Sequence, residues 1–492
     1  MHKIEVEKAN EFIRKKIHEV IPTYRNHYHL MAPIGWINDP NGFVYFKGEY
    51  HLFFQYYPYD SVWGPMHWGH AKSKDLVHWE SLPVALAPSE EYDINGCFSG
   101  SAIEKDGKLY LIYTGHVEEG EYRREVQCLA VSEDGIHFEK YVNNPIIAEE
   151  HIDGIGNIAE FRDPKVFQHE DIYYTIVASQ TEDKRGQMLL FESIDLFEWR
   201  FKSVVAEGEA DQGVMWECPD LFHLDGKDVL IFSPIEMEPL DYSYLNTSST
   251  VVFIGEMDWE TGKLAVENYH EIDYGLDFYA PQTCEGPNGE RIMVAWMQMW
   301  HRTIPTHDLK HLWSGSMTLP RELHVKDNCL IQTPPKAIYD EFEEIISIED
   351  QMIASGQISF ADSVFNQQYI QLIVDIIEGQ KITFLYAQDK ESLRLEYDMS
   401  TSLLSFSREN MGYDIKGIEK KQLTKREVRI PLMDNQLKLE IFRDTSSVEI
   451  FTATGETMTF TFYEKEKGNH MHLQTSEGPL VIQKFKSSKI SK

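Results

Sequence analysis

Three carboxylate residues stand at similar places in three separate stretches of the chain. Asp39, Asp163 and Glu217 each come one or two residues before a proline, and a short hydrophobic run follows each of them. A carboxylate can attack an electrophilic carbon, and two carboxyl groups in opposite protonation states can act as base and acid in one reaction. An Asp before Pro is also an ordinary turn residue, so residue type alone does not decide between catalysis and structure.

An internal repeat predicts how these carboxylates are positioned. The segment 73–79 (SKDLVHW) returns as 132–138 (SEDGIHF) and 193–199 (SIDLFEW), and a looser copy (MDWETG) follows at 257–262. The copies are about 60 residues apart, which suits a four-stranded unit with its loops.

The carboxylates recur in step with this repeat. Segments 99–102 (SGSA) and 280–283 (APQT) occupy the matching places in two further units, so the chain is expected to hold five units. Equivalent strands arranged radially form a β-propeller, whose innermost strands line a central channel. Asp39, Asp163 and Glu217 are therefore expected to meet in one funnel, although they are far apart in the sequence.

Composition and periodicity divide the whole chain into four regions. Residues 1–22 have apolar side chains near helical spacing and are expected to form a short amphipathic helix packed on the main body. Residues 23–335 carry the units of the five-bladed propeller. Residues 336–352 are acidic and are interpreted as a helix or linker, with a linker as the assignment. Residues 353–492 alternate with period two, which predicts an antiparallel β-sandwich. The expected fold class is all-β.

Charge and composition argue against several functions. The formal net charge is -34 at pH 7, whereas nucleic acids and anionic membranes are bound by clustered Lys and Arg. No apolar run approaches the length that spans a membrane. The five cysteines are scattered without a C-x-x-C spacing, and no metal site is expected. The N-terminus lacks the apolar core of a secretory signal, so a cytoplasmic location is expected. The protein is expected to be a monomer or a homodimer.

A series of motifs carries a resemblance to a known family. The motifs are 36–42 (WINDPNG), 53–56 (FFQY), 63–70 (WGPMHWGH), 98–101 (FSGS), 162–164 (RDP), 216–220 (WECPD), 277–282 (DFYAPQ), 319–322 (LPRE) and 444–451 (DTSSVEIF). In this order the chain resembles the β-fructofuranosidases of glycoside hydrolase family thirty-two, which include invertases, sucrose-6-phosphate hydrolases and fructan hydrolases. The resemblance covers nearly the whole chain, and the family's five-bladed propeller and β-sandwich agree with the repeat.

The resemblance assigns roles to individual residues. Asp39 is similar to the family's nucleophile, Glu217 to its acid/base, and Asp163 to a third carboxylate that holds hydroxyls of the fructose ring. These roles imply a retaining cleavage, in which Asp39 attacks C2 of a fructofuranosyl group while Glu217 protonates the departing oxygen. The residues that match sugar-contact positions are Asn38, Gln55, Trp63, Phe98, Ser99, Arg162 and Trp296, and the motif near the site adds Asp277 and Tyr279.

The resemblance implies a small-molecule fructoside as partner and no cofactor, and it leaves the rest of the substrate open. Hydrolysis of sucrose or sucrose-6-phosphate is the leading hypothesis, and a fructan hydrolase or fructosyltransferase is the alternative. A non-catalytic carbohydrate-binding protein is a hypothesis from another class, but it would be expected to lack one of the three carboxylates. A phosphate would need nearby cations, and the candidates are Arg123, Arg124, Lys184, Arg185, His301 and Arg302.

Overall fold

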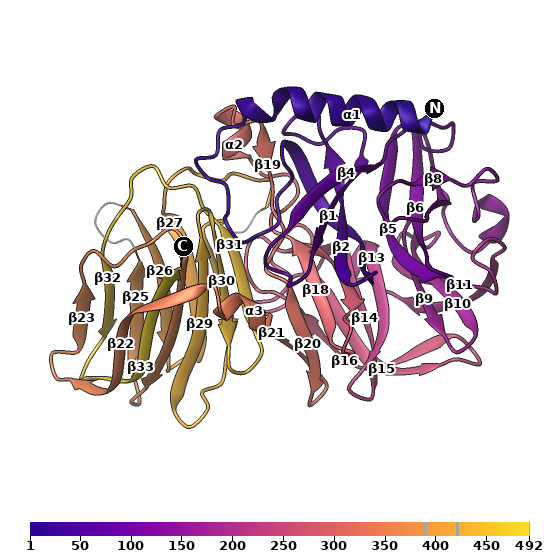
Figure 1. Cartoon of the computed structure of the whole chain (residues 1–492). Helices are drawn as coiled ribbons and strands as arrows, with labels where there is room; N and C mark the ends of the chain where they lie inside the picture. The colour runs from indigo at the N-terminus through magenta and orange to yellow at the C-terminus, as the bar shows by residue number, and fades with distance from the viewer. Residues whose placement is uncertain (387–390, 420–422, 492) are drawn as a thin grey trace.

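Strands dominate the chain, as the period-two hydrophobic pattern predicts. The computed structural model describes residues 1–386, 391–419 and 423–491. Within these residues the strands form seven sheets, five in the N-terminal part and two in the C-terminal part. The two groups of sheets make two lobes that lie side by side (Figure 1).

The five N-terminal sheets form the larger lobe. The first sheet contains β1 (Gly35–Phe46), β2 (Glu49–Tyr57), β3 (His67–Ser73), β4 (Glu80–Leu86) and β19 (Trp313–Ser314), and the second contains β5 (Gly96–Lys105), β6 (Lys108–Glu119), β7 (Tyr122–Ser132) and β8 (Glu139–Lys140). The third sheet contains β9 (Phe161–His169), β10 (Ile172–Gln180), β11 (Gly186–Ser193) and β12 (Arg200–Glu207), and the fourth contains β13 (Gln212–Leu224), β14 (Lys227–Met237), β15 (Val251–Asp258) and β16 (Lys263–Glu271). The fifth sheet contains β17 (Tyr279–Glu285), β18 (Arg291–Trp296), β20 (Arg321–Lys326) and β21 (Cys329–Thr333).

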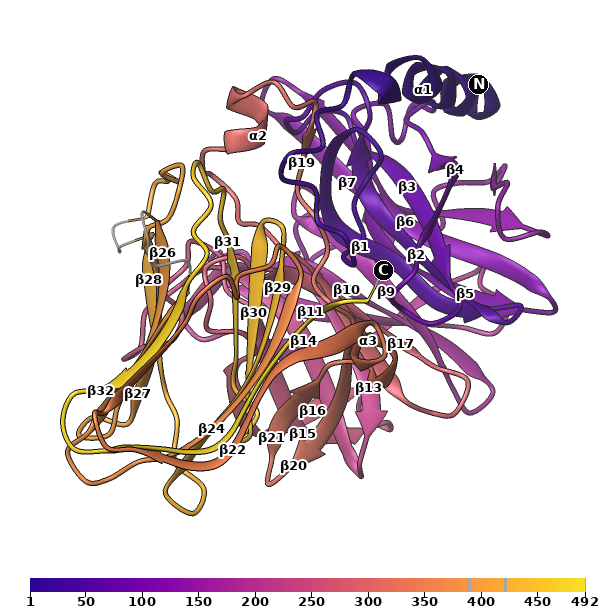
Figure 2. The ribbon, with the colours of Figure 1, turned by 60° about the vertical axis from the view of Figure 1, so that its left-hand side comes forward.

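The first strand of each sheet lies at the centre of this lobe. Contacts run from β1 to β5, β9, β13 and β17 in turn, and β17 contacts β1 again. The short strand β19 pairs parallel with β1, so the end of the lobe's sequence joins its beginning. The closed ring of inner strands is the arrangement of a β-propeller, and Figure 2 shows the same lobe beside the sandwich from another side.

Each inner strand is interrupted by a register shift at the repeat-equivalent position. A β-bulge bends a strand and re-aims its side chains, and Pro is tolerated there because its missing N–H breaks no ladder bond. Asp163 and Cys218 have positive φ angles of 64° and 49° at these bulges. The recurring Pro that the sequence shows after each carboxylate therefore marks the place where an inner strand bends.

The repeated SxD motif forms the turn between the third and fourth strands of a sheet. In the first copy the hydroxyl of Ser73 and the carboxylate of Asp75 accept hydrogen bonds from the backbone N–H groups that follow. A Ser and an Asp do the same at 132–138 and 193–199. Side chains that bond to their own turn in this way favour the turn over extended backbone, so the repeat is structural.

The N-terminal helix α1 (His2–Lys16) continues into the 3₁₀ turn η1 (Ile17–Glu19) and lies against β4 of the propeller, at the top of Figure 1. Ala9 is fully buried, and Val6 and Ile13 pack into the same hydrophobic cluster. Ile4 and Ile17 are 61% and 46% exposed. The expected helix is confirmed, but its apolar stripe is narrower than the helical spacing predicts.

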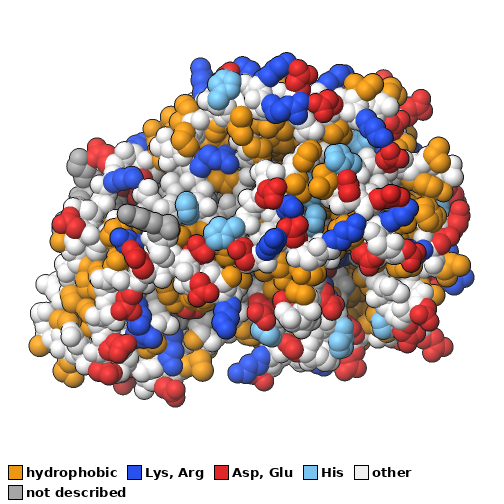
Figure 3. Space-filling view, in the orientation of Figure 1, with side chains coloured by type: hydrophobic (Ala, Val, Ile, Leu, Met, Phe, Trp, Pro, Cys, Tyr) orange, Lys and Arg blue, Asp and Glu red, His pale blue; other side chains and the backbone are white. Residues whose placement is uncertain are grey.

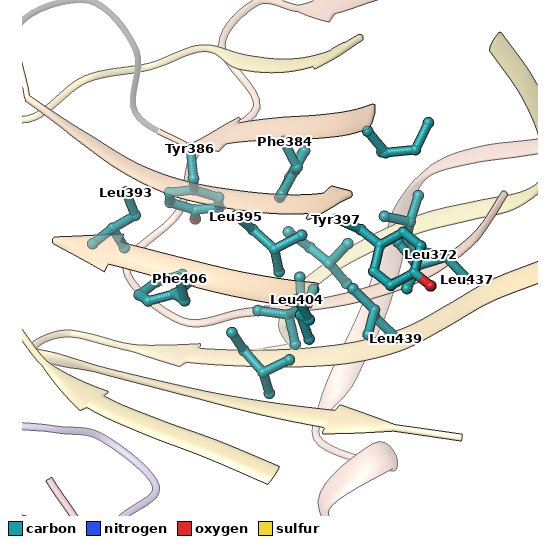
Figure 4. Close-up of a cluster of buried hydrophobic side chains, with 14 of the residues drawn as sticks. Leu372, Phe384, Tyr386, Leu393, Leu395, Tyr397, Leu404, Phe406, Leu437 and Leu439 are labelled. Carbon is teal, nitrogen blue, oxygen red and sulfur yellow. The ribbon is translucent and has the colours of Figure 1, made fainter. Parts of the chain in front are cut away.

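Two six-stranded sheets form the C-terminal β-sandwich. One contains β22 (Phe342–Ile353), β33 (Leu480–Ile490), β24 (Gln368–Asp375), β29 (Gln436–Asp444), β30 (Ser447–Thr452) and β31 (Thr457–Thr461), and the other contains β23 (Gln357–Phe360), β32 (Met471–Thr475), β25 (Lys381–Tyr386), β26 (Ser392–Asp398), β27 (Leu403–Asn410) and β28 (Lys425–Arg429). Leu372 and Leu439 of one sheet and Phe384 and Leu404 of the other belong to a single buried cluster (Figure 4). Alternate residues of each strand therefore fill the core, as period two predicts.

The prediction of a linker at 336–352 is wrong. Residues 336–339 form the short helix α3 (Lys336–Tyr339), and β22 is the edge strand of the first sandwich sheet, paired with β33. The acidic side chains that suggested a linker lie on this edge, where Glu344 and Glu343 pair with Lys486 (2.7 Å) and Lys489 (3.2 Å). Charged residues on an edge strand protect it from pairing with another chain.

A buried ionic cluster joins the two lobes. The two ring nitrogens of His29, which precedes the propeller, lie 2.8 Å from Asp444 and 2.8 Å from Glu449 of the sandwich. Arg321 of the propeller lies 2.6 Å from Glu449 and 3.0 Å from Asp273. Burial alone would lower the pKa of His29, but its two carboxylate partners raise that pKa to about 9.

This cluster predicts a pH dependence of stability. A His whose folded-state pKa is raised contributes stability below pH 6.5, and this contribution is lost as pH rises through about 9. The difference corresponds to roughly 3 kcal/mol. His29→Gln is therefore expected to lower the free energy of unfolding in urea most at pH 6 and least at pH 9. His78→Gln is the control, because His78 pairs with Asp75 on the surface, and an equal effect of His29→Gln at pH 6 and pH 9 would contradict the prediction.

The surface shows no single charged patch on the face drawn in Figure 3. Acidic side chains are spread over both lobes there, with Lys and Arg between them. None of the helices in the described part of the chain has the length and apolar character that crossing a membrane requires.

Candidate active site

A pocket of about 280 Å³ opens beside the bulges of the inner strands. Its lining residues are Asn38, Asp39, Gln55, Trp63, Phe98, Ser99, His116, Glu118, Arg123, Arg162, Asp163, Glu217 and Trp300. The structure therefore brings all three predicted carboxylates together, along with most of the predicted sugar contacts.

A larger cavity of about 820 Å³ lies among later residues of the same inner strands, including Phe43, Lys165 and Phe222. Lys165 is paired with Asp220 in the interior, at 3.0 Å. None of the three predicted carboxylates lines this cavity. The smaller pocket is the candidate active site because its lining holds the three carboxylates, even though the other cavity has the larger volume.

Asp39 is buried at the bulge of β1 and is surrounded by hydrogen-bond donors. Its Oδ2 accepts from Ser99 Oγ at 2.7 Å, and its Oδ1 accepts from Asn38 Nδ2 at 3.0 Å. The thiol of Cys218 is 3.6 Å from Oδ2. Burial raises the pKa of Asp39, and the charge of Glu217 raises it further, whereas these donors act in the opposite direction.

Asp163 lies at the bulge of β9 and faces the bulge of β13. Its Oδ2 accepts from the backbone N–H of Cys218 at 3.0 Å, and the thiol of the same residue is 3.5 Å away. Cys218 thus lies between Asp39 and Asp163. Burial and the charges of Glu217 and Asp39 raise the pKa of Asp163, although Arg162 opposes them. Burial and the neighbouring carboxylates also hold the pKa of Cys218 well above its usual value, so its sulfur stays protonated.

Glu217 on β13 has different partners from the two aspartates. Its Oε1 accepts from Arg162 Nε and Nη2 at 3.0 and 2.9 Å, and its Oε2 accepts from the hydroxyl of Tyr279 at 2.5 Å. Burial, and then Glu217 itself, hold the pKa of Tyr279 well above its usual value, so the phenol remains a donor. The side chain of Glu217 is 18% exposed and faces the pocket.

Arg162 balances the negative charge of the pocket. Its Nη1 also contacts Glu125 at 3.1 Å and Glu160 at 2.5 Å. Burial alone would lower the pKa of Arg162, but these carboxylates and Glu217 hold it well above its usual value. Arg162 thus shares its charge among Glu217, Glu125 and Glu160 while it also opposes the raised pKa of Asp163. Crowding of carboxylates in one pocket favours a proton within the group.

The outer part of the pocket is aromatic and polar. Trp63 is 45% exposed, and its ring meets Phe98 edge to face. Phe98 stacks on His116 with ring centroids 4.0 Å apart. His116 and Glu118 extend from β6, and Arg123 extends from β7. Rings of this kind can stack on a sugar while the polar groups bind its hydroxyls.

The sequence did not indicate His116, Glu118, Trp300 or Cys218 as site residues. The first two lie where a long β6–β7 hairpin projects past the inner strands, and the length of this hairpin was the only available signal. Cys218 directly follows Glu217 in the WECPD motif, and this position indicates that it lies close to the carboxylates. Trp300 comes from the connection between β18 and β19.

Two predicted contacts lie behind the pocket wall. Tyr279 reaches the site through its hydrogen bond with Glu217. Trp296 is fully buried and packs on Trp36 and Trp300, with ring centroids 5.6 and 4.9 Å apart. Neither residue lines the pocket.

The prediction that Asp277 contacts the sugar is wrong. Its carboxylate is buried between the lobes, where it accepts from Arg408 Nη1 at 2.7 Å, from the backbone N–H of Thr461 at 2.8 Å and from Arg302 Nη1 at 3.3 Å. Arg408 and Thr461 belong to the sandwich. Asp277 is therefore engaged by the domain interface.

Only one of the candidate phosphate ligands, Arg123, lies in the pocket lining. Arg123 lines the pocket, but it is paired with Glu125 at 2.7 Å and Glu160 at 3.3 Å. Arg302 is buried at the domain interface. The remaining candidates, Arg124, Lys184, Arg185 and His301, do not line the pocket.

The hydrogen bond that Ser99 donates to Asp39 leads to a prediction about the pH at which activity falls on the acid side. The sequence predicts Asp39 as a nucleophile, a role that requires its ionised form, and Ser99→Ala removes a donor that lowers its pKa. The acid limb of the pH profile of kcat/KM, which reports the free enzyme, is expected to move up by about one pH unit. Ser203→Ala in the outer strand β12, which loses a hydroxyl bond to Gly262, is the control. An unmoved limb in Ser99→Ala would contradict this role for Ser99.

Comparison with known proteins places this geometry in a family. Residues 29–334 match the "Glycosyl hydrolases family 32 N-terminal domain", and residues 356–491 match the "Glycosyl hydrolases family 32 C terminal" domain. The sucrose-6-phosphate hydrolase of Escherichia coli is 38% identical over 477 residues, covering 94% of each chain.

Solved structures agree with this match. A GH32 beta-fructofuranosidase of Bombyx mori has a TM-score of 0.85 at 34% identity, covering 100% of this chain and 99% of the other. A sucrose-6-phosphate hydrolase from Lactobacillus gasseri has a TM-score of 0.86 at 28% identity, covering 98% and 96%. The paired matches span both lobes, and the chain therefore belongs to glycosyl hydrolase family 32 and is a glycoside hydrolase.

Proposed function

We propose that this enzyme is a retaining β-fructofuranosidase that hydrolyses the terminal β-D-fructofuranosyl bond of sucrose or sucrose-6-phosphate. The observation that carries the proposal is the pairing of Asp39 and Glu217 in one pocket with different partners. Asp39 receives hydrogen bonds from neutral donors, whereas Glu217 lies between Arg162 and the hydroxyl of Tyr279. Two carboxyl groups with different environments are what the chemistry requires.

In the first step Asp39 attacks C2 of the fructosyl group, and the bond from C2 to the glycosidic oxygen breaks. Glu217 gives its proton to that oxygen, so the aglycone leaves as a neutral alcohol. Asp39 is then esterified to C2, and Glu217 is ionised. The contacts with Ser99 and Asn38 hold the attacking carboxylate in one orientation.

In the second step Glu217 takes a proton from a water molecule, and the water oxygen attacks C2. The ester bond to Asp39 breaks, and β-fructose leaves. The two nitrogens of Arg162 that contact Glu217 stabilise the ionised form that this step needs. Asp163 is proposed to bind fructose hydroxyls, since it lines the same pocket as Asp39 and Glu217.

The size of the pocket supports a small substrate. A volume of about 280 Å³ is near the lower end for ligand sites, which are roughly 300–1,000 Å³, and suits a terminal fructosyl group. The names of the Escherichia coli and Lactobacillus gasseri relatives support sucrose-6-phosphate, and the name of the Bombyx mori relative supports a β-fructofuranoside in general.

The test is a substrate profile of the purified chain. Fructose release is measured on sucrose, sucrose-6-phosphate, inulin and levan, and kcat/KM is expected to be highest for one of the two disaccharides. Absence of fructose release from all four would refute the proposal. In the presence of methanol the retaining mechanism predicts methyl β-fructofuranoside, and an α product would refute retention while leaving the activity intact.

A further inference from the structure

The connection between β18 and β19 carries an aromatic residue to the pocket. Trp300 lines the pocket, and its ring stacks on Trp36 with centroids 5.9 Å apart and an interplanar angle of 28°. Trp36 Nε1 donates to Asn38 Oδ1 at 2.7 Å, and Asn38 Nδ2 donates to Asp39 Oδ1 at 3.0 Å. The position of Trp300 is thus linked by direct contacts to the proposed nucleophile.

Two residues later, the same connection enters the domain interface. The side chain of Arg302 is 1% exposed. It donates to Leu276 O, to Asp277 Oδ1 at 3.3 Å and to Asn246 Oδ1 at 3.2 Å in the propeller, and to Glu419 Oε1 at 2.8 Å in the sandwich. One buried guanidinium therefore binds both domains.

Thr303 extends this contact along the backbone. Its N–H donates to Lys416 O at 2.7 Å, and its Oγ1 accepts from Lys416 N at 2.9 Å. A Cβ added at Gly417 would lie 3.1 Å from Arg302 Cγ. The sandwich segment 416–419 thus lies directly against residues 302–303 of the propeller.

The backbone between the pocket and the interface has an unfavourable conformation. His301, which separates Trp300 from Arg302, has a φ of 59°. A residue other than Gly in the left-handed region is strained, and this conformation persists where the surrounding contacts determine it. Here those contacts are the indole stack on one side and the bonds to the sandwich on the other.

We propose that Arg302 and Glu419 are positioning residues through which the sandwich holds Trp300 in the wall of the pocket. The inference rests on the proposed function, because it assigns Trp300 to the binding of the aglycone of the fructoside. Breaking the contact with Glu419 frees the Trp300 connection, so the aglycone binds less well. Asp39 stays in place because Ser99 also holds its carboxylate, and Glu217 stays in place between Arg162 and Tyr279.

The test is a double-mutant cycle that combines Glu419→Ala with Trp300→Ala. Glu419→Ala is expected to raise KM for sucrose about fivefold with a smaller change in kcat, since the lost interaction serves binding. Glu419→Gln retains an acceptor for Arg302 and is expected to restore most of the loss. In a Trp300→Ala background Glu419→Ala should add little, because its effect passes through that indole.

Thr303→Val provides a milder variant in case Glu419→Ala does not fold, and it should raise KM in the same direction. The control is Glu464→Gln, which loses a buried ion pair with Arg443 within the sandwich, and which should lower Tm without changing KM. Unchanged KM in the Glu419 and Thr303 variants, or additive effects with Trp300→Ala, would overturn the inference. Loss of fructose release in the wild type would instead refute the proposed function.

Discussion

Asp39→Ala is expected to lower kcat for fructose release from sucrose by roughly 10⁴-fold or more, since it removes the group that we propose forms the covalent bond. KM should change much less. The carboxylate bonds to Ser99 and Asn38 and contacts the thiol of Cys218, so its removal leaves space beside C2 of a bound fructosyl group. Steady-state kinetics on sucrose measure the loss.

That space provides a sharper measurement than the loss of rate. Azide can enter it and attack C2 directly, which yields a fructosyl azide of inverted, α configuration. Asp60→Ala is the control, since Asp60 is an exposed residue outside the pocket lining, and full activity is expected there. Residual activity of Asp39→Ala above a few per cent, or rescue with a β product, would rule out Asp39 as the nucleophile.

The positions of the carboxylates could be predicted because the fold marks them locally. Asp39, Asp163 and Glu217 each precede a Pro that falls at a bulge of an inner strand. The bulge requirement acts on neighbouring residues, so it leaves a signal in the sequence. The SxD turn is a second local signal, and it occurs in three of the five sheets. A ring of equivalent strands then brings distant residues together without any further information.

The error at Asp277 has the opposite cause. The residue lies two positions before Tyr279, which does reach Glu217, so proximity in sequence predicted the same environment. Its partners Arg408 and Thr461 are more than 130 residues later and belong to another domain. Ion pairs across an interface depend on how two domains dock, and no local pattern records that.

The error at 336–352 arises from the same limit. An acidic run is typical of a solvated linker, but it also suits an edge strand whose neighbour carries lysines. The lysines of β33 that pair with Glu343 and Glu344 are at the end of the chain. Trp300 was missed for a similar reason, because the connection that carries it packs against a sandwich segment far away in the sequence.

Glu217→Ala is expected to affect the two steps of the reaction differently. For sucrose, whose leaving oxygen needs a proton, kcat/KM should fall by about 10²–10⁴-fold. For β-fructofuranosyl fluoride, whose leaving group needs little help, attack by Asp39 should persist, and release from the ester should become limiting. A burst of fluoride followed by a slow steady state is the expected trace, and azide should raise the steady rate with a β product.

Glu217→Ala is also expected to shift the pH dependence of activity on the fluoride substrate. The charge of Glu217 contributes to the raised pKa values of Asp39 and Asp163, so its removal lowers both. The ionised form of Asp39 then persists to lower pH, and the acid limb for the fluoride substrate should move down. Asp163→Asn is the control, because a residue that binds hydroxyls should slow sucrose and the fluoride alike. If Glu217→Ala slowed both substrates equally, Glu217 would be a binding residue, and the proton for the departing oxygen would have to come from another group in the pocket.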